Sequence, residues 1–263
     1  MEFEDIIYEK KEGVGKIIIN REEKRNAFRA KTFSEMTRAL LDAWGNKDVG
    51  VVVITGAGDK AFCSGGDVSD RRDGGYGNGE GGSTLGFTIP MPIDLVRTIP
   101  KPVIAMVNGY AIGGGHVLHV VCYLSIASET AIFGQVGPRF GSFDAGWGSA
   151  YLARVVGQKK AREIWFLCRR YSAQDALEMG LVNKVVPPDK LEEETMAWCK
   201  EILQLSPTAL KVLKSSFGAD VDHIAGIEGM SSHSLAMYYG SEESREGSMA
   251  FLEKRLPDYS KFR

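Results

Sequence analysis

Short apolar strands separated by helical segments are the feature that most constrains the fold of this chain. Residues 50–55 (GVVVIT) and 103–107 (VIAMV) are nearly continuous apolar runs. Such runs are typical of strands whose sheet is covered on both faces. Residues 14–20 alternate and are rich in β-branched side chains, which predicts another strand. Because an amphipathic segment at 31–46 lies between these strands, the pattern indicates an α/β fold.

The order of the segments predicts two parts of unequal size. A glycine-rich polar stretch at 65–82 predicts a loop, and the segment 109–115 predicts a glycine turn. From Leu191 onward the apolar spacing is almost wholly helical. We therefore expect a core over residues 1–195 that holds the site, and a helical C-terminal extension over residues 196–263 that serves oligomerisation and covers the active site.

Composition and local patterns argue against several classes of function. The chain has 263 residues and a formal net charge of -2, so it lacks the basic surplus typical of nucleic-acid binding. No apolar run is long enough to cross a membrane, and the acidic N-terminus does not resemble a signal peptide. The histidines lack metal-site spacing and the cysteines are far apart, so we expect no metal, free thiols and a cytoplasmic location. The four cysteines are Cys63, Cys122, Cys168 and Cys199.

Two glycine turns carry the strongest chemical signal. Residues 61–67 (AFCSGGD) and 109–116 (GYAIGGGH) each follow an apolar strand. Glycine permits backbone shapes that expose N–H groups with no side chain in the way. Two such N–H groups that converge on one point would bind an oxyanion. One glycine turn is weak evidence, but two turns of this kind in one chain are more specific.

The sequence resembles the crotonase, or enoyl-CoA hydratase/isomerase, superfamily over essentially its whole length. The matching segments, in order, are INREEKRNAF, AFCSGGD, KPVIAMVNGYAIGGGH and FGQVG. The resemblance implies a crotonase-like spiral of ββα units, a homo-oligomer (trimer or hexamer), and coenzyme A as part of the substrate with no tightly bound cofactor. It also implies that the N–H groups of Gly66 and Gly114 hold the enolate that forms from the thioester carbonyl.

The chain departs from the family at two positions that matter for water chemistry. Simple hydratases of the family use two glutamates, and this chain has Val117 and Gly137 in their places. Without those carboxylates, water addition to an enoyl thioester lacks its general acid–base pair. On this ground the sequence argues against plain hydratase activity.

A candidate acid lies further along the chain. The segment GSFDAGWGS at 141–149 resembles one branch of the superfamily, which contains 2-ketocyclohexanecarboxyl-CoA hydrolase and 1,4-dihydroxy-2-naphthoyl-CoA synthase (naphthoate synthase). By that resemblance Asp144 is the catalytic acid or base and Ser142 orients the substrate. Tyr239 and Tyr76 match tyrosines that face the substrate ring. An aspartate between glycines is ordinarily a turn former, and Tyr239 equally fits an ordinary aromatic residue of an amphipathic helix.

The same resemblance implies a substrate-binding set. Arg25 and Lys254 match cations that meet the phosphates of coenzyme A, although solvated surface charge explains any single basic residue at least as well. The other members lie in the loop after the first glycine turn and in the FGQVG segment: Arg71, Tyr76, Gln135 and Gly137.

The two enzymes of the branch run related chemistry in opposite directions. The synthase closes a ring by Dieckmann condensation, whereas the hydrolase opens a cyclic β-ketoacyl-CoA through a thioester enolate. Val136 stands where bicarbonate-dependent synthases have threonine, which disfavours bicarbonate and favours ring opening. The GSFDAGWGS segment is closer to the synthase, so ring closure stays an alternative, and a catalytically silent crotonase-fold binding protein is a further one. Tyr123 stands where relatives commonly have aspartate, and its role is open.

Overall fold

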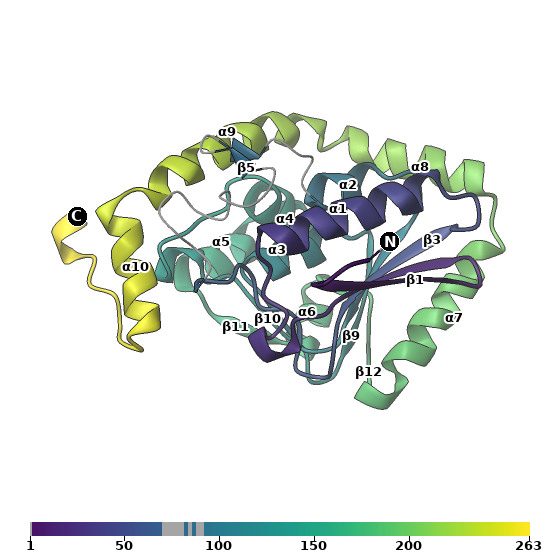
Figure 1. The fold of residues 1–263 in the computed structure, drawn as a ribbon, viewed down its shortest axis with the longest axis horizontal. Coiled ribbons are helices and arrows are strands. Elements are labelled where there is room, and N and C mark those ends of the chain that lie inside the picture. The colour runs from purple at the N-terminus through teal and green to yellow at the C-terminus, as the bar shows by residue number, and fades with distance from the viewer. Residues whose placement is uncertain (1, 70–81, 84–85, 88–91) are drawn as a thin grey trace.

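A six-stranded sheet forms the larger layer of the computed structural model, which describes residues 2–69, 82–83, 86–87 and 92–263 (Figure 1). Its strand order is β1-β2-β3-β7-β9-β12. The first two strands pair antiparallel, and all other neighbours pair parallel. The strands are β1 (Ile6–Lys11), β2 (Val14–Ile19), β3 (Val51–Gly56), β7 (Val103–Val107), β9 (Leu124–Ser128) and β12 (Lys184–Val186).

A smaller sheet of four strands has the order β11-β10-β8-β4. Strands β4, β8 and β10 are parallel, and β11 pairs antiparallel with β10. Its strands are β4 (Ala61–Cys63), β8 (Tyr110–Ile112), β10 (Ile132–Gly134) and β11 (Arg170–Ser172). A separate pair consists of β5 (Gly82–Ser83) and β6 (Gly86–Phe87).

Consecutive strands alternate between the two sheets. Strands β3, β7 and β9 lie in the larger sheet, and the strands that follow them along the chain, β4, β8 and β10, lie in the smaller one. A helix follows before the chain returns to the larger sheet. This repetition confirms the α/β spiral of ββα units. The helices are α1 (Ala30–Gly45), α2 (Pro92–Thr98), α3 (Gly114–Val121), α4 (Leu152–Val156), α5 (Gln158–Leu167), α6 (Ala173–Glu178), α7 (Leu191–Leu203), α8 (Pro207–Ala219), α9 (Asp222–Tyr239) and α10 (Glu242–Leu252).

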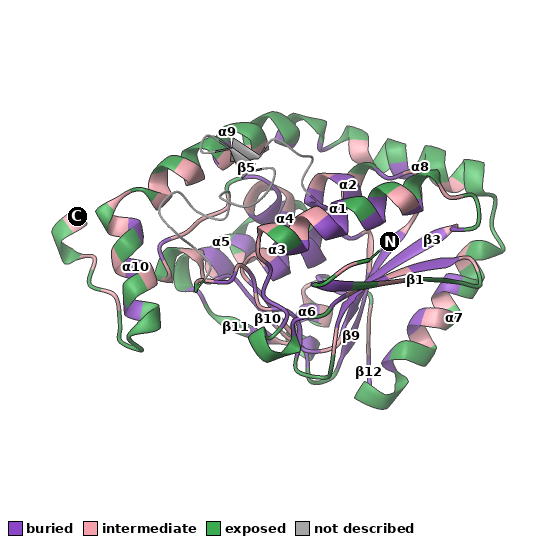
Figure 2. Cartoon of the chain, viewed as in Figure 1, coloured by how far each residue is buried: buried purple, intermediate pink, exposed green. Residues whose placement is uncertain are grey.

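The larger sheet is covered on both faces, as its apolar strands predict. Along β3, Val52 and Ile54 belong to the main hydrophobic core, which also contains residues of α1, α2 and α3. Val51 and Val53 point the other way, into a second cluster with Leu191 and Cys199 of α7. Figure 2 shows the buried strands between partly exposed helices. All four cysteines are buried and free, as expected.

One expectation from the sequence needs adjustment. The predicted turn over residues 109–115 contains strand β8, which is only three residues long and is stabilised by pairing with β4 and β10. Residues 195 and 196, between which we expect the core and the C-terminal extension to divide, both lie in α7, a helix that packs against the larger sheet. Most of the loop predicted at 65–82 lies outside the described residues.

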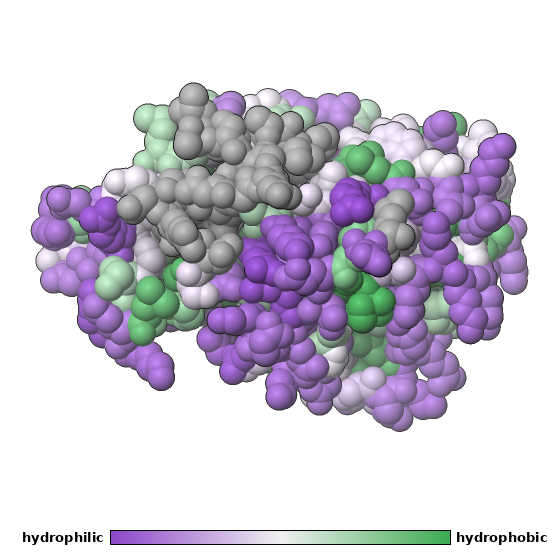
Figure 3. All heavy atoms as spheres, in the orientation of Figure 1, coloured by the Kyte–Doolittle hydropathy of each residue, from purple (hydrophilic) through white to green (hydrophobic). Residues whose placement is uncertain are grey.

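Helices α8 to α10 close the chain and present mostly exposed residues (Figure 2). Helix α9 runs back across the molecule and contacts the turn Trp147–Tyr151, so one of its sides approaches the segment that carries Asp144. On the face in Figure 3, hydrophilic residues dominate and hydrophobic residues form small patches. Within the described ranges, no helix is both long enough and apolar enough to span a membrane.

Candidate active site

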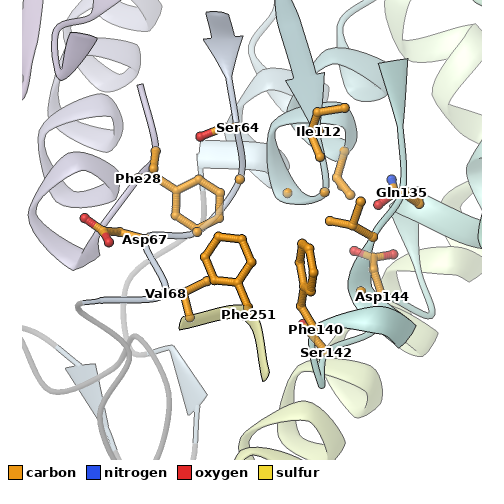
Figure 4. A pocket seen from close by; sticks show the side chains of 18 of the residues that line it. Phe28, Ser64, Asp67, Val68, Ile112, Gln135, Phe140, Ser142, Asp144 and Phe251 are labelled. Atoms are coloured by element: carbon orange, nitrogen blue, oxygen red, sulfur yellow. The ribbon is translucent and has the colours of Figure 1, made fainter. Parts of the chain in front are cut away.

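One cavity of about 600 Å³ brings most of the predicted site residues together (Figure 4). Its walls come from the two glycine turns, the segment that follows β10, helix α9 and the end of α10. Side chains far apart in the sequence therefore meet in one place. The predicted residues that line the cavity are Arg25, Gly66, Gly114, Gln135, Gly137, Ser142, Asp144 and Tyr239.

The two glycine turns approach each other because β4 and β8 are parallel neighbours. Gly65 has a φ of 95° and Gly113 a φ of 57°, both in the left-handed region that favours glycine. A methyl group on Gly65 would lie 3.3 Å from the backbone nitrogen of Gly114. The turns are thus in near contact at the wall of the cavity.

The N–H groups of Gly66 and Gly114 are placed to bind a ligand. The backbone N–H of Phe28 donates to the Gly65 carbonyl, and the Phe28 carbonyl accepts from the Asp67 N–H, both at 2.9 Å. These two bonds fix the residues on either side of Gly66 and do not use the N–H of Gly66 itself. Gly114 is the first residue of α3, where a helical N–H lacks an intrahelical acceptor. Neither N–H has an acceptor in the described part of the chain. Paired donors at a helix N-terminus suit an anionic oxygen.

Asp144 lies half-buried in the cavity wall. The N–H groups of Gly146 and Gly148 donate to its Oδ1 at 3.2 and 2.6 Å. Figure 4 shows the carboxyl group directed toward other side chains that line the cavity. Burial raises the pKa of Asp144 to about 6, and the two N–H bonds oppose the rise. A carboxyl group with a pKa near neutrality can accept or return a proton under physiological conditions.

Ser142 and Tyr239 form a hydroxyl pair beside this carboxyl group. Their oxygen atoms lie 2.9 Å apart, and both residues line the cavity. Tyr239 is the last residue of α9, so the helix brings its phenol to a loop 97 positions earlier in the chain. The sequence left Tyr239 open between a site residue and an ordinary helix aromatic, and its position favours the site.

Gln135 and Gly137 support the wall rather than offer reactive groups. The side chain of Gln135 is buried, with Nε2 3.0 Å from Nδ1 of His116. Burial lowers the pKa of His116 to about 3, so this ring is neutral. A methyl group on Gly137 would lie 2.8 Å from the carbonyl oxygen of Ser142, which explains why glycine fits there.

The predicted cations divide into two groups. Arg25 lines the cavity with its guanidinium 5.6 Å from the Tyr110 ring centroid, and Arg170 of β11 lies 5.8 Å from the same ring. Arg170 also lines the cavity, and sequence reasoning missed it because nothing local distinguishes it from a surface cation. Lys254 lies just beyond α10 and outside the cavity lining. Arg71 and Tyr76 fall outside the described residues.

A second carboxyl group, Glu228 of α9, lines the cavity and was also missed. A methyl group on Gly146 would lie 2.0 Å from its Oε2 and 3.2 Å from its Cα, so the helix abuts the Asp144 loop. Burial, together with the Asp144 and Asp94 charges, raises the pKa of Glu228 to about 7. No local pattern in the helix marks Glu228, because only the packing of α9 brings it to the site.

The structure gives Tyr123 a packing role. Its ring lies 4.4 Å from the ammonium nitrogen of Lys214, a buried residue of α8. The same ammonium donates to the carbonyl oxygens of Val96 and Lys101 at 2.9 and 2.8 Å. Tyr123 therefore covers the buried lysine that ties α8 to the core, away from the cavity lining, and burial lowers the pKa of Lys214 to about 7.

Paired sheets linked by ββα units, with two glycine turns meeting at one cavity, define the crotonase-like class of fold. Residues 9–262 match the sequence profile described as enoyl-CoA hydratase/isomerase. The chain belongs to this family, and it is accordingly a crotonase-family enzyme that processes acyl-CoA thioesters.

Solved structures agree with this assignment. Carnitinyl-CoA hydratase from Mycobacterium avium is 31% identical over 98% of both chains, with a TM-score of 0.82. OdaA from Pseudomonas aeruginosa is 28% identical over 95% of this chain and 99% of its own, with a TM-score of 0.85. An enoyl-CoA hydratase from Mycobacterium avium subsp. paratuberculosis K-10, 24% identical over 98% of this chain and 100% of its own, has a TM-score of 0.84 and shows likeness of fold.

In the ranges that the structure describes, no three histidine, cysteine, aspartate or glutamate side chains are grouped so as to hold a metal ion.

Proposed function

We propose that this enzyme opens the ring of a cyclic β-ketoacyl-CoA by hydrolysis, through a thioester enolate. The observation that carries the proposal is the position of Asp144, a carboxyl group with a pKa of about 6, in the cavity that also holds both glycine N–H donors. A base for water and a site for an enolate oxygen are the two groups that this cleavage requires.

In the proposed reaction, Asp144 removes a proton from water and the hydroxide adds to the ring ketone. The Ser142–Tyr239 hydroxyl pair, at 2.9 Å, donates a hydrogen bond to the ketone oxygen as it becomes negative. The bond between the ketone carbon and the α-carbon then breaks, and its electron pair forms the thioester enolate. Gly66 and Gly114 N–H groups hold the enolate oxygen until the α-carbon takes up a proton. The product is an open-chain acyl-CoA with a new carboxylate.

Coenzyme A is proposed as part of the substrate, with no tightly bound cofactor and no bicarbonate. Arg25 and Arg170 flank Tyr110 on the cavity lining, so cations are available for the phosphates. Because such contacts are partly exposed, each contributes modestly. Val136 supplies no hydroxyl to hold a bicarbonate ion.

The test supplies purified enzyme with 2-oxocyclohexane-1-carboxyl-CoA and, separately, with o-succinylbenzoyl-CoA, and identifies products by mass spectrometry. Ring opening requires a product heavier than the first substrate by one water. Conversion of the second substrate alone would overturn ring opening and support the naphthoate synthase type of ring closure. Binding of both thioesters without turnover would support a catalytically silent crotonase-fold protein.

A second candidate is addition of water to an enoyl-CoA, and Glu228 is the observation that favours it. The two glutamates of simple hydratases are absent from this chain, yet Asp144 and Glu228 both line the cavity. Two carboxyl groups are what such a hydration needs for acid and base. Crotonyl-CoA is therefore the third substrate of the test, with loss of the enoyl absorbance as the readout.

A further inference from the structure

Glu228 is a second titratable group in the cavity, and the ring-opening mechanism proposed above gives it no task. It comes from α9, whereas Asp144 comes from the loop after β10. The helix and the loop are joined directly, because the Ala145 N–H donates to Oγ of Ser231 at 3.1 Å. Glu228 also crowds Gly146, two residues beyond Asp144, where only glycine leaves room for its carboxyl group. The two acids are thus held at one wall of the cavity.

The hydrogen bonds of the two carboxyl groups are unequal. Asp144 accepts two backbone N–H bonds on one oxygen, and these favour its anion. Glu228 accepts a longer bond, 3.3 Å, from the Ser232 hydroxyl on Oε1. Its Oε2 is buried and has no hydrogen-bond partner in the described part of the chain. The anion is therefore better stabilised on Asp144, and the proton is better placed on Glu228.

The charged groups around Glu228 reinforce this order. Asp144 in the loop and Asp94 on α2 both raise its pKa, and burial raises it further. The backbone N–H of Trp147 offsets part of this rise in the pKa of Glu228. The nearby cation, Arg97 of α2, has its guanidinium 3.7 Å from the ring centroid of Trp147. The stronger hydrogen bonds to Asp144 and the carboxylates facing Glu228 thus favour the anion on Asp144 and the proton on Glu228, an arrangement that supplies a base and an acid in one site.

We propose that Glu228 is the second acid–base group of this site and donates the proton that the enolate α-carbon takes up after the ring opens. The inference rests on the proposed ring opening and deepens it. Asp144 receives the proton that leaves water. Glu228 gives its own proton to the α-carbon, which completes the new C–H bond. Glu228 then regains a proton from the newly formed carboxylic acid, and Asp144 releases its proton to solvent, so charge and atoms balance.

The first experiment measures ring opening by Glu228→Gln, with Glu201→Gln on the exposed surface of α7 as the matched control. We expect kcat of Glu228→Gln to fall by about 10²- to 10⁴-fold with KM little changed, because a general acid acts on the chemical step. Exchange of the α-protons of the open-chain product with D2O should fall in parallel. Glu228→Asp should restore part of both. Wild-type kcat and exchange in Glu228→Gln would overturn the proposal.

The second experiment needs no substrate and separates this inference from the proposed function. Infrared difference spectra follow the protonated carboxyl groups of the free enzyme as pH changes. We expect a carboxyl band that titrates near pH 7, is absent from Glu228→Gln, and titrates at lower pH in Asp144→Asn because a neighbouring charge is gone. If this band is found while no cyclic thioester is opened, the proposed function fails and the acid–base pair stands. A band unaffected by Glu228→Gln would refute the pair whatever the substrate.

Discussion

Asp144 and Glu228 show how strongly burial can raise the pKa of a carboxyl group. The pKa of Asp144 is raised from 3.8 to about 6, and that of Glu228 from 4.5 to about 7. Two backbone N–H bonds oppose the rise at Asp144, whereas the Asp144 and Asp94 charges add to the rise at Glu228. At neutral pH the site therefore offers an ionised base beside a partly protonated acid.

Replacement of Asp144 by asparagine should abolish turnover and leave binding largely intact. The amide cannot take a proton from water, so kcat should fall by at least about 10²- to 10⁴-fold. The cations near Tyr110 are untouched, so a coenzyme A thioester should bind with near wild-type affinity in calorimetry. Loss of binding together with turnover would instead indicate that Asp144 maintains the cavity.

Catalysis and stability should depend on pH in opposite senses at this residue. Ring opening needs ionised Asp144, so kcat/KM should rise with pH through about 6. The pKa of Asp144 is about 6 in the folded state and 3.8 in the unfolded state. Between these pH values the unfolded state binds fewer protons than the folded state, so the free energy of unfolding falls as pH rises. Relative to Asp144→Asn, the wild type should lose up to about 3 kcal/mol of unfolding free energy as pH rises across this range. Urea unfolding of both proteins at several pH values measures the difference.

The glycine turn before α3 is the element on which the oxyanion donors depend. A methyl group on Gly114 would lie 2.6 Å from ring atoms of Phe28, so Gly114→Ala must move either the turn or the Phe28 ring, whose backbone holds Gly65 and Asp67 on either side of Gly66. We expect kcat to fall about 10²- to 10³-fold, the loss typical for one oxyanion donor. Gly218→Ala in α8 is the control, because its nearest neighbour would be 4.0 Å away. The control should keep wild-type kcat and gain about 0.5–1 kcal/mol in unfolding free energy.

Helix α8 is tied to the core by the Lys214 ammonium and the ring of Tyr123. Removal of the ring in Tyr123→Leu should lower the free energy of unfolding by about 0.5–2 kcal/mol, the range of a cation–π contact. Tyr123→Phe keeps the ring and loses only hydroxyl contacts of 3.5 Å, so it should stay close to wild type. Equal losses in both variants, measured by chemical denaturation, would place the effect in the hydroxyl group.

At the scale of the whole molecule, the resemblance to crotonases implies a homo-oligomer, and exposed apolar residues of α8 and α9 provide a test of it. Phe217, Met230 and Met237 are 69%, 65% and 79% exposed, so they are available for contact with a second subunit. We expect light scattering to give the mass of a trimer or hexamer. The double variant Phe217→Asp, Met230→Asp should lower the measured mass toward that of the monomer, whereas the control Glu201→Gln should leave the mass unchanged. A monomeric wild type would contradict the proposal.

The strands of the larger sheet were predictable because Val51 to Ile54 are apolar without interruption, and burial on both faces requires that pattern. Strand β8 was not, because three residues are too few for a local signal and its stability comes from its neighbours. The glycine turns and the Asp144 loop were predictable because their motifs are contiguous. Glu228 and Arg170 were not, since each reaches the cavity only through tertiary packing.

The alternation of strands between the sheets has a consequence for the lengths of two connections. Residues 57–60 link β3 to β4, residues 108–109 link β7 to β8, and the Tyr110 N–H donates to the Lys60 carbonyl at 3.0 Å. One inserted residue in either link would slide its strand by about 3.3 Å. That shift is as long as a hydrogen bond, so it would pull the two amide donors out of common reach of a single oxygen. Insertions and deletions among relatives of this chain should therefore avoid the two links at residues 57–60 and 108–109.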